Sequence, residues 1–189
     1  AFGHRKLSIL DLSASGHQPM TYLDKYTITY NGEIYNYLEI KEELMRENYI
    51  FTSQTDTEVI LASYDKWGQE CVDKFNGMWS FAIYDREKNI VFCSRDRFGI
   101  KPFYYTNMSN VFAFASEIKQ FTAIDDFEPK LNSARAYDFL ASNLLDHTKE
   151  TLFLDVFQLR GGENLFYDLS VQTSRIMQWY DFANNIRTN

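Results

Sequence analysis

The sequence contains little cysteine and little histidine, and neither is clustered. Its two cysteines, Cys71 and Cys93, form no C-x-x-C pair and no pattern that binds a metal. The three histidines lie in unrelated segments, so a histidine-based metal site is not predicted either. These absences exclude a disulfide scaffold and a zinc module, and they favour a reduced, cytoplasmic protein.

Long apolar runs, phosphate-binding loops and excess positive charge are also missing. No run approaches the roughly 20 apolar residues that a membrane-spanning helix needs. No loop of the form G-x-x-x-x-G-K-S/T is present, so the chain is not expected to bind ATP. With 19 basic and 26 acidic residues the net charge is −7, which argues against nucleic acid as the main partner. The sequence thus predicts no membrane, no nucleic acid and no metal as partners of this chain.

The sequence does contain enough apolar and aromatic residues for a packed core. Aromatic residues make up 17% of the 189 residues and apolar residues 45%, too many for a disordered chain. A chain of this length buries roughly 70% of its extended surface. It begins Ala1-Phe2-Gly3 without an initiator methionine, so we expect it to be a piece of a longer protein.

Capping signals predict the early helices. Asn36, with Glu39 three residues on, predicts the start of one helix. Thr55 with Glu58 predicts the start of a second helix, which ends at Gly68. Further helical segments are predicted at residues 69–75, 117–121 and 133–145.

Strands are predicted where apolar residues alternate or run continuously. They are residues 6–12, 26–30, 78–85, 90–95, 103–106, 111–116 and, as the last strand, 163–169. Several of these segments are apolar on both faces, so their sheet must be covered on both faces. The sequence therefore predicts an α+β domain of four layers, α/β/β/α.

The dipeptide Asn31-Gly32 has two interpretations. It is the commonest signal for a tight turn, which would end the strand 26–30. Alternatively, an Asn side-chain amide and a Gly backbone N–H can both point at one developing negative oxygen, as in an oxyanion hole. On the dipeptide alone, the turn is favoured.

Asp56 also has two interpretations. An acidic side chain in the first turn of a helix interacts favourably with the helix dipole, and the sequence alone favours this role. A carboxylate at the same place could instead bind an ammonium group.

The loop 95–102 concentrates charge, since it contains Arg95, Asp96, Arg97 and Lys101. One interpretation is a solvated loop with an internal ion pair. Because glycine and proline shape the loop and it also carries apolar residues, a docking surface for another domain is the alternative.

Six ordered motifs together resemble one known family. They are residues 4–9 with 16–19, 30–37, 55–59, 76–82, 95–102 and 115–119. Their order and spacing look like the glutaminase domain of glutamine-hydrolysing asparagine synthetase, a class II glutamine amidotransferase. The resemblance runs from about residue 3 to about residue 182.

The resemblance implies an N-terminal-nucleophile (Ntn) hydrolase fold, here incomplete at its N-terminus. In this family the first residue of the mature chain is a cysteine, whose thiolate attacks the side-chain amide of glutamine. The family's Cys-Gly-Ile start and its R-G-P-D loop are absent from this sequence. We therefore expect the 189 residues alone to be inactive, with Cys71 and Cys93 as buried structural residues.

The resemblance also implies which residues form the site. Asn31 and Gly32 match the oxyanion-hole positions. Glu33 and Asp56 match residues that hold the polar groups of glutamine, Asp56 its α-ammonium. The amino-acid end of the pocket is matched by Lys6, Leu7, Ser8, Ile9 and Leu10.

The sequence departs from the family at two further places. Lys6 stands where the family usually has an arginine that binds the α-carboxylate of glutamine. Lysine keeps the charge but loses the bidentate geometry, so weaker binding is expected. Residues 158–164 replace a proline-rich turn of the family, and nothing in the sequence explains that change.

Beyond the pocket, the resemblance implies a partner domain. The ammonia would pass to a C-terminal synthetase domain, and only that domain would need ATP and Mg²⁺, to amidate aspartate. Residues 1–169 would form the amidotransferase domain and residues 170–189 an exit linker. The candidates for the interface between the domains are Arg95, Asp96 and Arg97. The oligomeric state stays open, a homodimer included.

Two alternatives to a glutaminase come from other classes of protein. One is a non-catalytic scaffold of the kind found in β-lactam synthetase, which keeps the fold without the nucleophile. The other is an interaction domain that docks through residues 95–102. The presence of Asn31, Gly32, Glu33 and Asp56 favours the glutaminase, because a scaffold needs no glutamine pocket.

Overall fold

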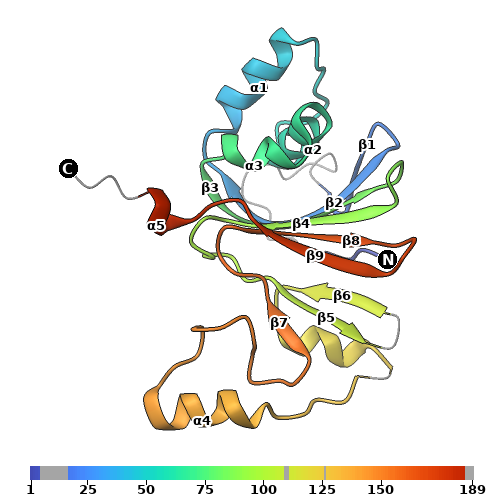
Figure 1. The fold of residues 1–189 in the computed structure, drawn as a ribbon. Coiled ribbons are helices and arrows are strands. Elements are labelled where there is room, and N and C mark those ends of the chain that lie inside the picture. Colours follow the sequence, from blue (N-terminus) through green and yellow to red (C-terminus); the bar gives the residue numbers. More distant parts are fainter. Residues whose placement is uncertain (5–16, 109–110, 126, 186–189) are drawn as a thin grey trace, which may run out of the picture.

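The computed structural model describes residues 1–4, 17–108, 111–125 and 127–185 (Figure 1). The strand predicted at residues 6–12 lies outside the described residues. No helix in the described part of the chain has the length and apolar content needed to cross a membrane.

The larger of the two sheets has six strands, all antiparallel to their neighbours, in the order β1-β2-β3-β4-β8-β9. Its longest pair is β2 and β3, which stay in register over nine residues each. The strands are β1 Met20–Tyr22, β2 Tyr26–Ile34, β3 Gly77–Asp85, β4 Ile90–Arg95, β8 Glu163–Asp168 and β9 Thr173–Gln178.

The smaller sheet has three antiparallel strands in the order β6-β5-β7. They are β5 Tyr104–Met108, β6 Val111–Ala115 and β7 Val156–Gln158. The α-helices are α1 Tyr37–Arg46, α2 Asp56–Trp67, α3 Cys71–Lys74, α4 Ser133–Ser142 and α5 Phe182–Asn185, with 3₁₀ turns at Gly68–Glu70 and Ile118–Ala123.

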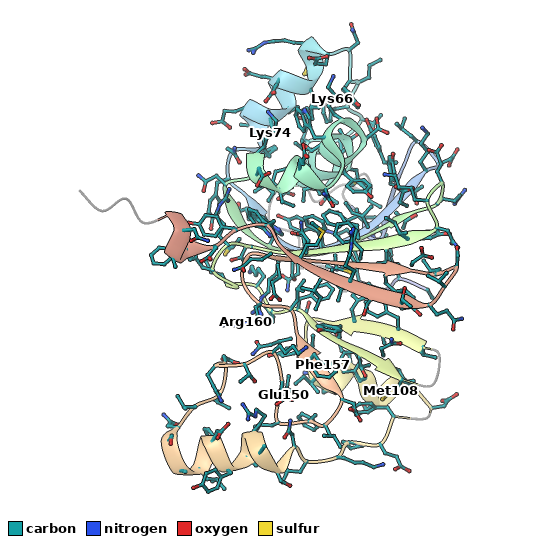
Figure 2. All side chains as sticks on the ribbon, in the orientation of Figure 1. Lys66, Lys74, Met108, Glu150, Phe157 and Arg160 are labelled. Atoms are coloured by element: carbon teal, nitrogen blue, oxygen red, sulfur yellow. The ribbon has the colours of Figure 1, made fainter. Side chains whose placement is uncertain are left out.

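The elements stack in four layers, which confirms the α/β/β/α prediction. Figure 1 shows α1, α2 and α3 on one face of the large sheet, the small sheet on its other face, and α4 beyond the small sheet. Strand β4 shows why both faces must be covered: Phe92 packs in the cluster under the helices, while Val91 and Cys93 pack between the sheets. Phe157 of β7, labelled in Figure 2, also packs against this inter-sheet cluster.

Strand β2 connects the core to the cavity described below. Tyr26, Ile28 and Tyr30 alternate toward α1 and α2 and belong to the cluster under these helices. Thr29, between Ile28 and Tyr30, and Asn31, directly after Tyr30, belong to the opposite face of the strand. Because successive side chains of a strand point to opposite faces, core residues and candidate site residues alternate along β2.

The prediction of a turn at Asn31-Gly32 is wrong. Both residues lie within β2, where Asn31 pairs with Ser80 and Gly32 with Trp79. The local turn signal is overridden because β3 offers a continuous antiparallel partner as far as Ile34. An oxyanion hole formed by Asn31 and Gly32 would therefore be built on an extended strand and not on a turn.

The predicted helix starts are correct, but only one of the two caps forms. Thr55 caps α2 by accepting a hydrogen bond from the backbone N–H of Glu58 (3.4 Å). Asn36 makes no cap for α1. Its side chain instead donates to the carbonyl of Lys74 (3.0 Å) and accepts from the N–H of Asn76 (2.8 Å). Asn36 thus ties the start of α1 to the segment before β3.

The sequence predicts no strand after β8, and this prediction is wrong. Residues 173–178 form β9, which pairs with β8 along its whole length. All six residues of β9 are exposed, as an edge strand allows, so the apolar alternation that reveals a half-buried strand is lacking. Part of the segment predicted as an exit linker therefore belongs to the large sheet.

Candidate active site

A cavity of about 740 Å³ opens at the end of β2 that leads into α1. Its wall contains residues 29–33 of β2, residues 55–57 at the start of α2, and residues 115–117 at the end of β6. The size is typical of a site for a small molecule. The cavity brings together Asn31, Gly32, Glu33 and Asp56.

Gly32 lies where the backbones of β2 and β3 approach closely. A Cβ at this position would lie 2.2 Å from the carbonyl oxygen of Met78 and 2.7 Å from the Cα of Trp79. Its φ of +155° is also rarely adopted by residues with a side chain. Glycine is therefore required here, in the cavity wall next to Asn31.

The side chain of Asn31 is held from the second sheet. Its amide nitrogen donates to the hydroxyl of Ser116, just after β6, over 3.3 Å. This hydrogen bond spans the two sheets and presents the amide at the cavity wall. The arrangement suits the donor role of an oxyanion hole.

Asp56 is the first residue of α2 and is only 6% exposed. Its Oδ2 accepts a hydrogen bond from the hydroxyl of Tyr30 (2.7 Å) and another from the backbone N–H of Ile34 (3.1 Å). Burial raises the pKa of Asp56, although these two donors and the N–H of Thr57 oppose the rise. The negative charge of Glu33, which lines the same cavity, raises this pKa further.

Among the described residues, Asp56, Asp85 and Asp96 are the buried aspartates, and their hydrogen bonding differs. Asp96 is saturated by four backbone N–H donors, two on each oxygen. Asp85 forms an ion pair with the ammonium of Lys88 and accepts hydrogen bonds from the hydroxyl of Tyr64 and the backbone N–H of Lys88.

Asp56 alone of these three lines the cavity. The bonds from Tyr30 and Ile34 both end on Oδ2, and no described cation pairs with Asp56. A buried carboxylate without a counter-charge is costly, so Asp56 is suited to bind a cationic group of a ligand.

The remaining predicted pocket residues cannot be placed against this cavity. Lys6, Leu7, Ser8, Ile9 and Leu10 all lie outside the described residues. Their assignment to the amino-acid end of the pocket, and the consequence of lysine at position 6, stay predictions.

The charged loop after β4 is built around its own backbone. The guanidinium of Arg95 donates to the carbonyls of Lys101 (2.6 Å), Gly99 (2.7 Å) and Leu159. Asp96 accepts from three backbone N–H groups of the same loop and from the N–H of Trp79 in β3. Both side chains therefore shape the loop.

Arg97 holds the C-terminal part of the chain against α3. It donates to the carbonyls of Phe75 and Asp73 and stacks over the rings of Trp179 (5.0 Å) and Tyr180 (5.4 Å). The apolar side chains of this loop, Phe98 and Ile100, are 65% and 59% exposed. Docking of another domain on this loop stays a prediction. The exposed side chains of Phe98 and Ile100 would form the apolar part of such a docking surface.

Neither cysteine belongs to the cavity. Cys71 in α3 and Cys93 in β4 are completely buried, and burial raises the pKa of both thiols. Both therefore pack as small apolar residues. Within the described residues, no group of three or more His, Cys, Asp and Glu side chains suits a metal ion.

Sequence reasoning missed the residues that position the site. Tyr30 and Ser116 were each predicted as part of a strand and of a motif, without a role in the site. Gln18 is buried and accepts a hydrogen bond from the backbone N–H of Tyr30 over 2.7 Å. The alternation of β2 indicates that Tyr30 points into the core, but the partner of its hydroxyl lies 26 residues away in the sequence.

The fold and the cavity define the class of protein. Glutamine phosphoribosylpyrophosphate amidotransferase from Bacillus subtilis superposes with a TM-score of 0.62 over 89% of this chain and 33% of that chain, at 17% identity. This likeness concerns the fold alone. The architecture is that of the Ntn-hydrolase class II glutamine amidotransferases, as the resemblance implied.

The chain belongs to the glutamine amidotransferase domain family, whose model matches residues 1–180. It is 38% identical to asparagine synthetase 2 (glutamine-hydrolyzing) of Bacillus subtilis over 188 residues, which cover 97% of this chain and 25% of that protein. It is 44% identical to asparagine synthetase 3 of the same organism over 134 residues, which cover 69% of this chain and 22% of that protein. The predicted resemblance to asparagine synthetases is confirmed, and the chain spans about a quarter of the length of these relatives.

Proposed function

We propose that this chain binds glutamine and forms the glutaminase domain of an asparagine-synthetase-type enzyme. The observation that carries the proposal is Asp56, a buried carboxylate without a described counter-charge, in the same cavity as Asn31 and Gly32. In this proposal Asp56 binds the α-ammonium of glutamine. Glu33 holds a further polar group of the substrate, and Lys6 faces its carboxylate.

The proposed chemistry is acyl transfer in two steps. A thiolate attacks the side-chain carboxamide carbon of glutamine, and the carbonyl oxygen becomes an oxyanion. The amide of Asn31 and the N–H of Gly32 donate to this oxyanion and lower the barrier. The C–N bond then breaks, the nitrogen takes up a proton and leaves as ammonia, and water hydrolyses the thioester to glutamate.

The nucleophile of the proposed reaction is the N-terminal cysteine that the resemblance implies. Cys71 and Cys93 do not suit this role, because they are buried and their pKa values are raised, so neither forms a thiolate at neutral pH. We therefore propose that the 189 residues alone release no ammonia from glutamine.

The proposed acceptor of the ammonia is aspartate, activated with ATP and Mg²⁺ in a second domain of the same protein. The printed names of the similar proteins, and the fact that this chain spans only about a quarter of them, support this proposal. The non-catalytic scaffold is not favoured, because the relatives are described as glutamine-hydrolyzing.

Ammonia release from glutamine by the complete gene product that contains this chain tests the proposal. The wild-type protein should release ammonia, and Asp56→Asn should lose most kcat/KM because it removes the charge that binds the ammonium. The matched control is Asp65→Asn on the same helix, since Asp65 accepts from Tyr49 (2.8 Å) and does not line the cavity. A wild-type protein without glutaminase activity, or an Asp56→Asn variant as active as the control, would overturn the proposal.

A further inference from the structure

Tyr30 combines a core ring with a polar contact at the cavity. Its ring packs in the cluster under α1 and α2, and the residue is 4% exposed. Its hydroxyl crosses from β2 to the first residue of α2 and donates to Oδ2 of Asp56 over 2.7 Å. A phenylalanine would fill the same apolar space, so packing alone does not explain the hydroxyl.

The carboxylate of Asp56 has two oxygens that a rotation about its terminal bond would exchange. The hydroxyl of Tyr30 and the N–H of Ile34 both hold Oδ2, from two different positions of β2. With Oδ2 held twice, the other oxygen is fixed as the one available to a ligand. The backbone of Tyr30 is itself fixed by Gln18, so the donor is held in place as well.

We propose that Tyr30 is a positioning residue for the amino-acid substrate: its hydroxyl, with the N–H of Ile34, holds Oδ2 of Asp56 so that Oδ1 receives the α-ammonium group. This inference rests on the proposed function and deepens it, because it assigns the ammonium contact to one oxygen and adds a residue outside the predicted site.

The hydroxyl of Tyr30 can act only as a donor toward an ionised Asp56. Burial, together with the charge of Asp56, raises the pKa of Tyr30 well above its ordinary value, so the phenol keeps its proton. A neutral donor beside a carboxylate makes a charge-assisted hydrogen bond, which is stronger than one between neutral groups. The same bond favours the charged form of Asp56, which is the form that binds an ammonium.

Removal of the hydroxyl should therefore weaken substrate binding without disturbing the chemistry. In Tyr30→Phe, Oδ2 keeps a single donor, so KM for glutamine should rise about tenfold, as expected for one lost hydrogen bond to a charged group. The value of kcat should stay within about twofold, because the lost interaction is equally strong in the ground state and the transition state.

The pH dependence supplies a readout that a purely structural role would not change. Since Tyr30 lowers the pKa of Asp56, the acid limb of kcat/KM should move to higher pH in Tyr30→Phe. Among the described residues, the other ionisable side chains that line the cavity are those of His4, Glu33, Lys101 and Glu117. They are the same in both proteins, so the difference between the two profiles reports on Asp56.

The matched control is Tyr26→Phe. Tyr26 lies on the same face of the same strand and in the same core cluster, but its hydroxyl is paired with Asp65 and not with Asp56. Steady-state ammonia release by the complete gene product should show unchanged KM and an unchanged acid limb for this variant. Equal changes in both variants would mean that the loss of any buried hydroxyl from β2 acts through stability, and would overturn the inference.

A substrate analogue separates the ammonium contact from the rest of the pocket. 4-Carbamoylbutanoate is glutamine without its α-amino group, and its inhibition constant should be the same for wild type and Tyr30→Phe. In the Asp56→Asn background, Tyr30→Phe should have no further effect on KM. If Tyr30→Phe does not fold, Tyr30→Leu serves as the second variant without a hydroxyl.

The outcomes distinguish this inference from the function on which it rests. A wild-type protein that does not hydrolyse glutamine overturns both. A wild-type glutaminase with the same KM and the same acid limb after Tyr30→Phe overturns the role of Tyr30 and leaves the proposed function standing. A KM effect that persists in the Asp56→Asn background shows that Tyr30 does not act through Asp56, and also overturns the inference.

Discussion

Replacement of single glycines by alanine tests the close approach of β2 and β3 that forms the cavity wall. At Gly32 two effects coincide, because φ is +155° and a Cβ would lie 2.2 Å from the carbonyl oxygen of Met78. Gly68 has only the conformational effect, with φ of +58° and no atom within 4 Å. Gly77 has only the steric effect, since its Cβ would lie 2.2 Å from the carbonyl oxygen of Glu33. Gly3 has neither effect and serves as the control.

The expected losses of stability follow from whether a substitution has the conformational effect, the steric effect or both. An unfavourable φ costs about 1 to 3 kcal/mol, which is the expected loss of stability for Gly68→Ala. Overpacking costs about 1 to 3 kcal/mol, which is the lower bound expected for Gly77→Ala, because the atom that it meets is backbone. Gly32→Ala should lose about the sum, roughly 2 to 6 kcal/mol, out of the roughly 5 to 15 kcal/mol typical of a folded domain.

Urea unfolding followed by tryptophan fluorescence measures these differences, since Trp79 is buried and lies opposite Gly32. The expected order of stability is Gly3→Ala, then Gly68→Ala and Gly77→Ala, then Gly32→Ala. If Gly32→Ala unfolds at the same urea concentration as Gly3→Ala, the two strands do not approach as closely as described. The requirement for glycine next to Asn31 would then be refuted.

Two further predictions concern residues that support the site. Hydrogen bonds from Ser53 and Thr52 outweigh the effect of burial and hold the pKa of Glu58 below its ordinary value of 4.5. A lowered folded-state pKa stabilises the fold above the unfolded-state pKa, so the free energy of unfolding should fall as the pH drops below about 4.5, and Glu58→Gln should show less of this dependence. Arg97→Lys should lower stability by about 1 to 3 kcal/mol in urea unfolding, because lysine cannot both stack on Trp179 and donate to two carbonyls. An Arg97→Lys variant with wild-type stability would contradict the stabilising role of these Arg97 contacts.

Elements with a strong local signal were predictable from the sequence. Helix α2 has Thr55 as its N-cap and Gly68 as its C-cap, the two positions predicted for its ends, because a hydroxyl cap and a glycine with positive φ act within a few residues. Strand β4 has the predicted bounds and is covered on both faces, because its apolar residues do not alternate with polar ones. In each case the information lies inside the element.

Features that depend on distant partners were not predictable in the same way. The turn signal of Asn31-Gly32 yields to pairing with β3, which begins 45 positions after Gly32 at Gly77. The cap predicted at Asn36 yields to bonds with residues 74 and 76. Strand β9 exists because β8 offers an edge, whereas its own exposed residues show no period.

The buried aspartates show how one residue type acquires a structural or a binding role. Asp96 accepts from three N–H groups of its own loop and from the N–H of Trp79 in β3, so its carboxylate is fully engaged in holding that loop on the strand. Asp56 begins a helix as any capping-turn acid does, yet β2 brings donors to one of its oxygens only. The acidic residue in the first turn of α2 is visible in the sequence, but the incomplete pairing that suits it to a ligand arises only when β2 and α2 meet. The place of Asp56 in the first turn of α2 is thus confirmed, whereas the binding of an ammonium group stays a proposal, which the position of Asp56 in the cavity wall supports.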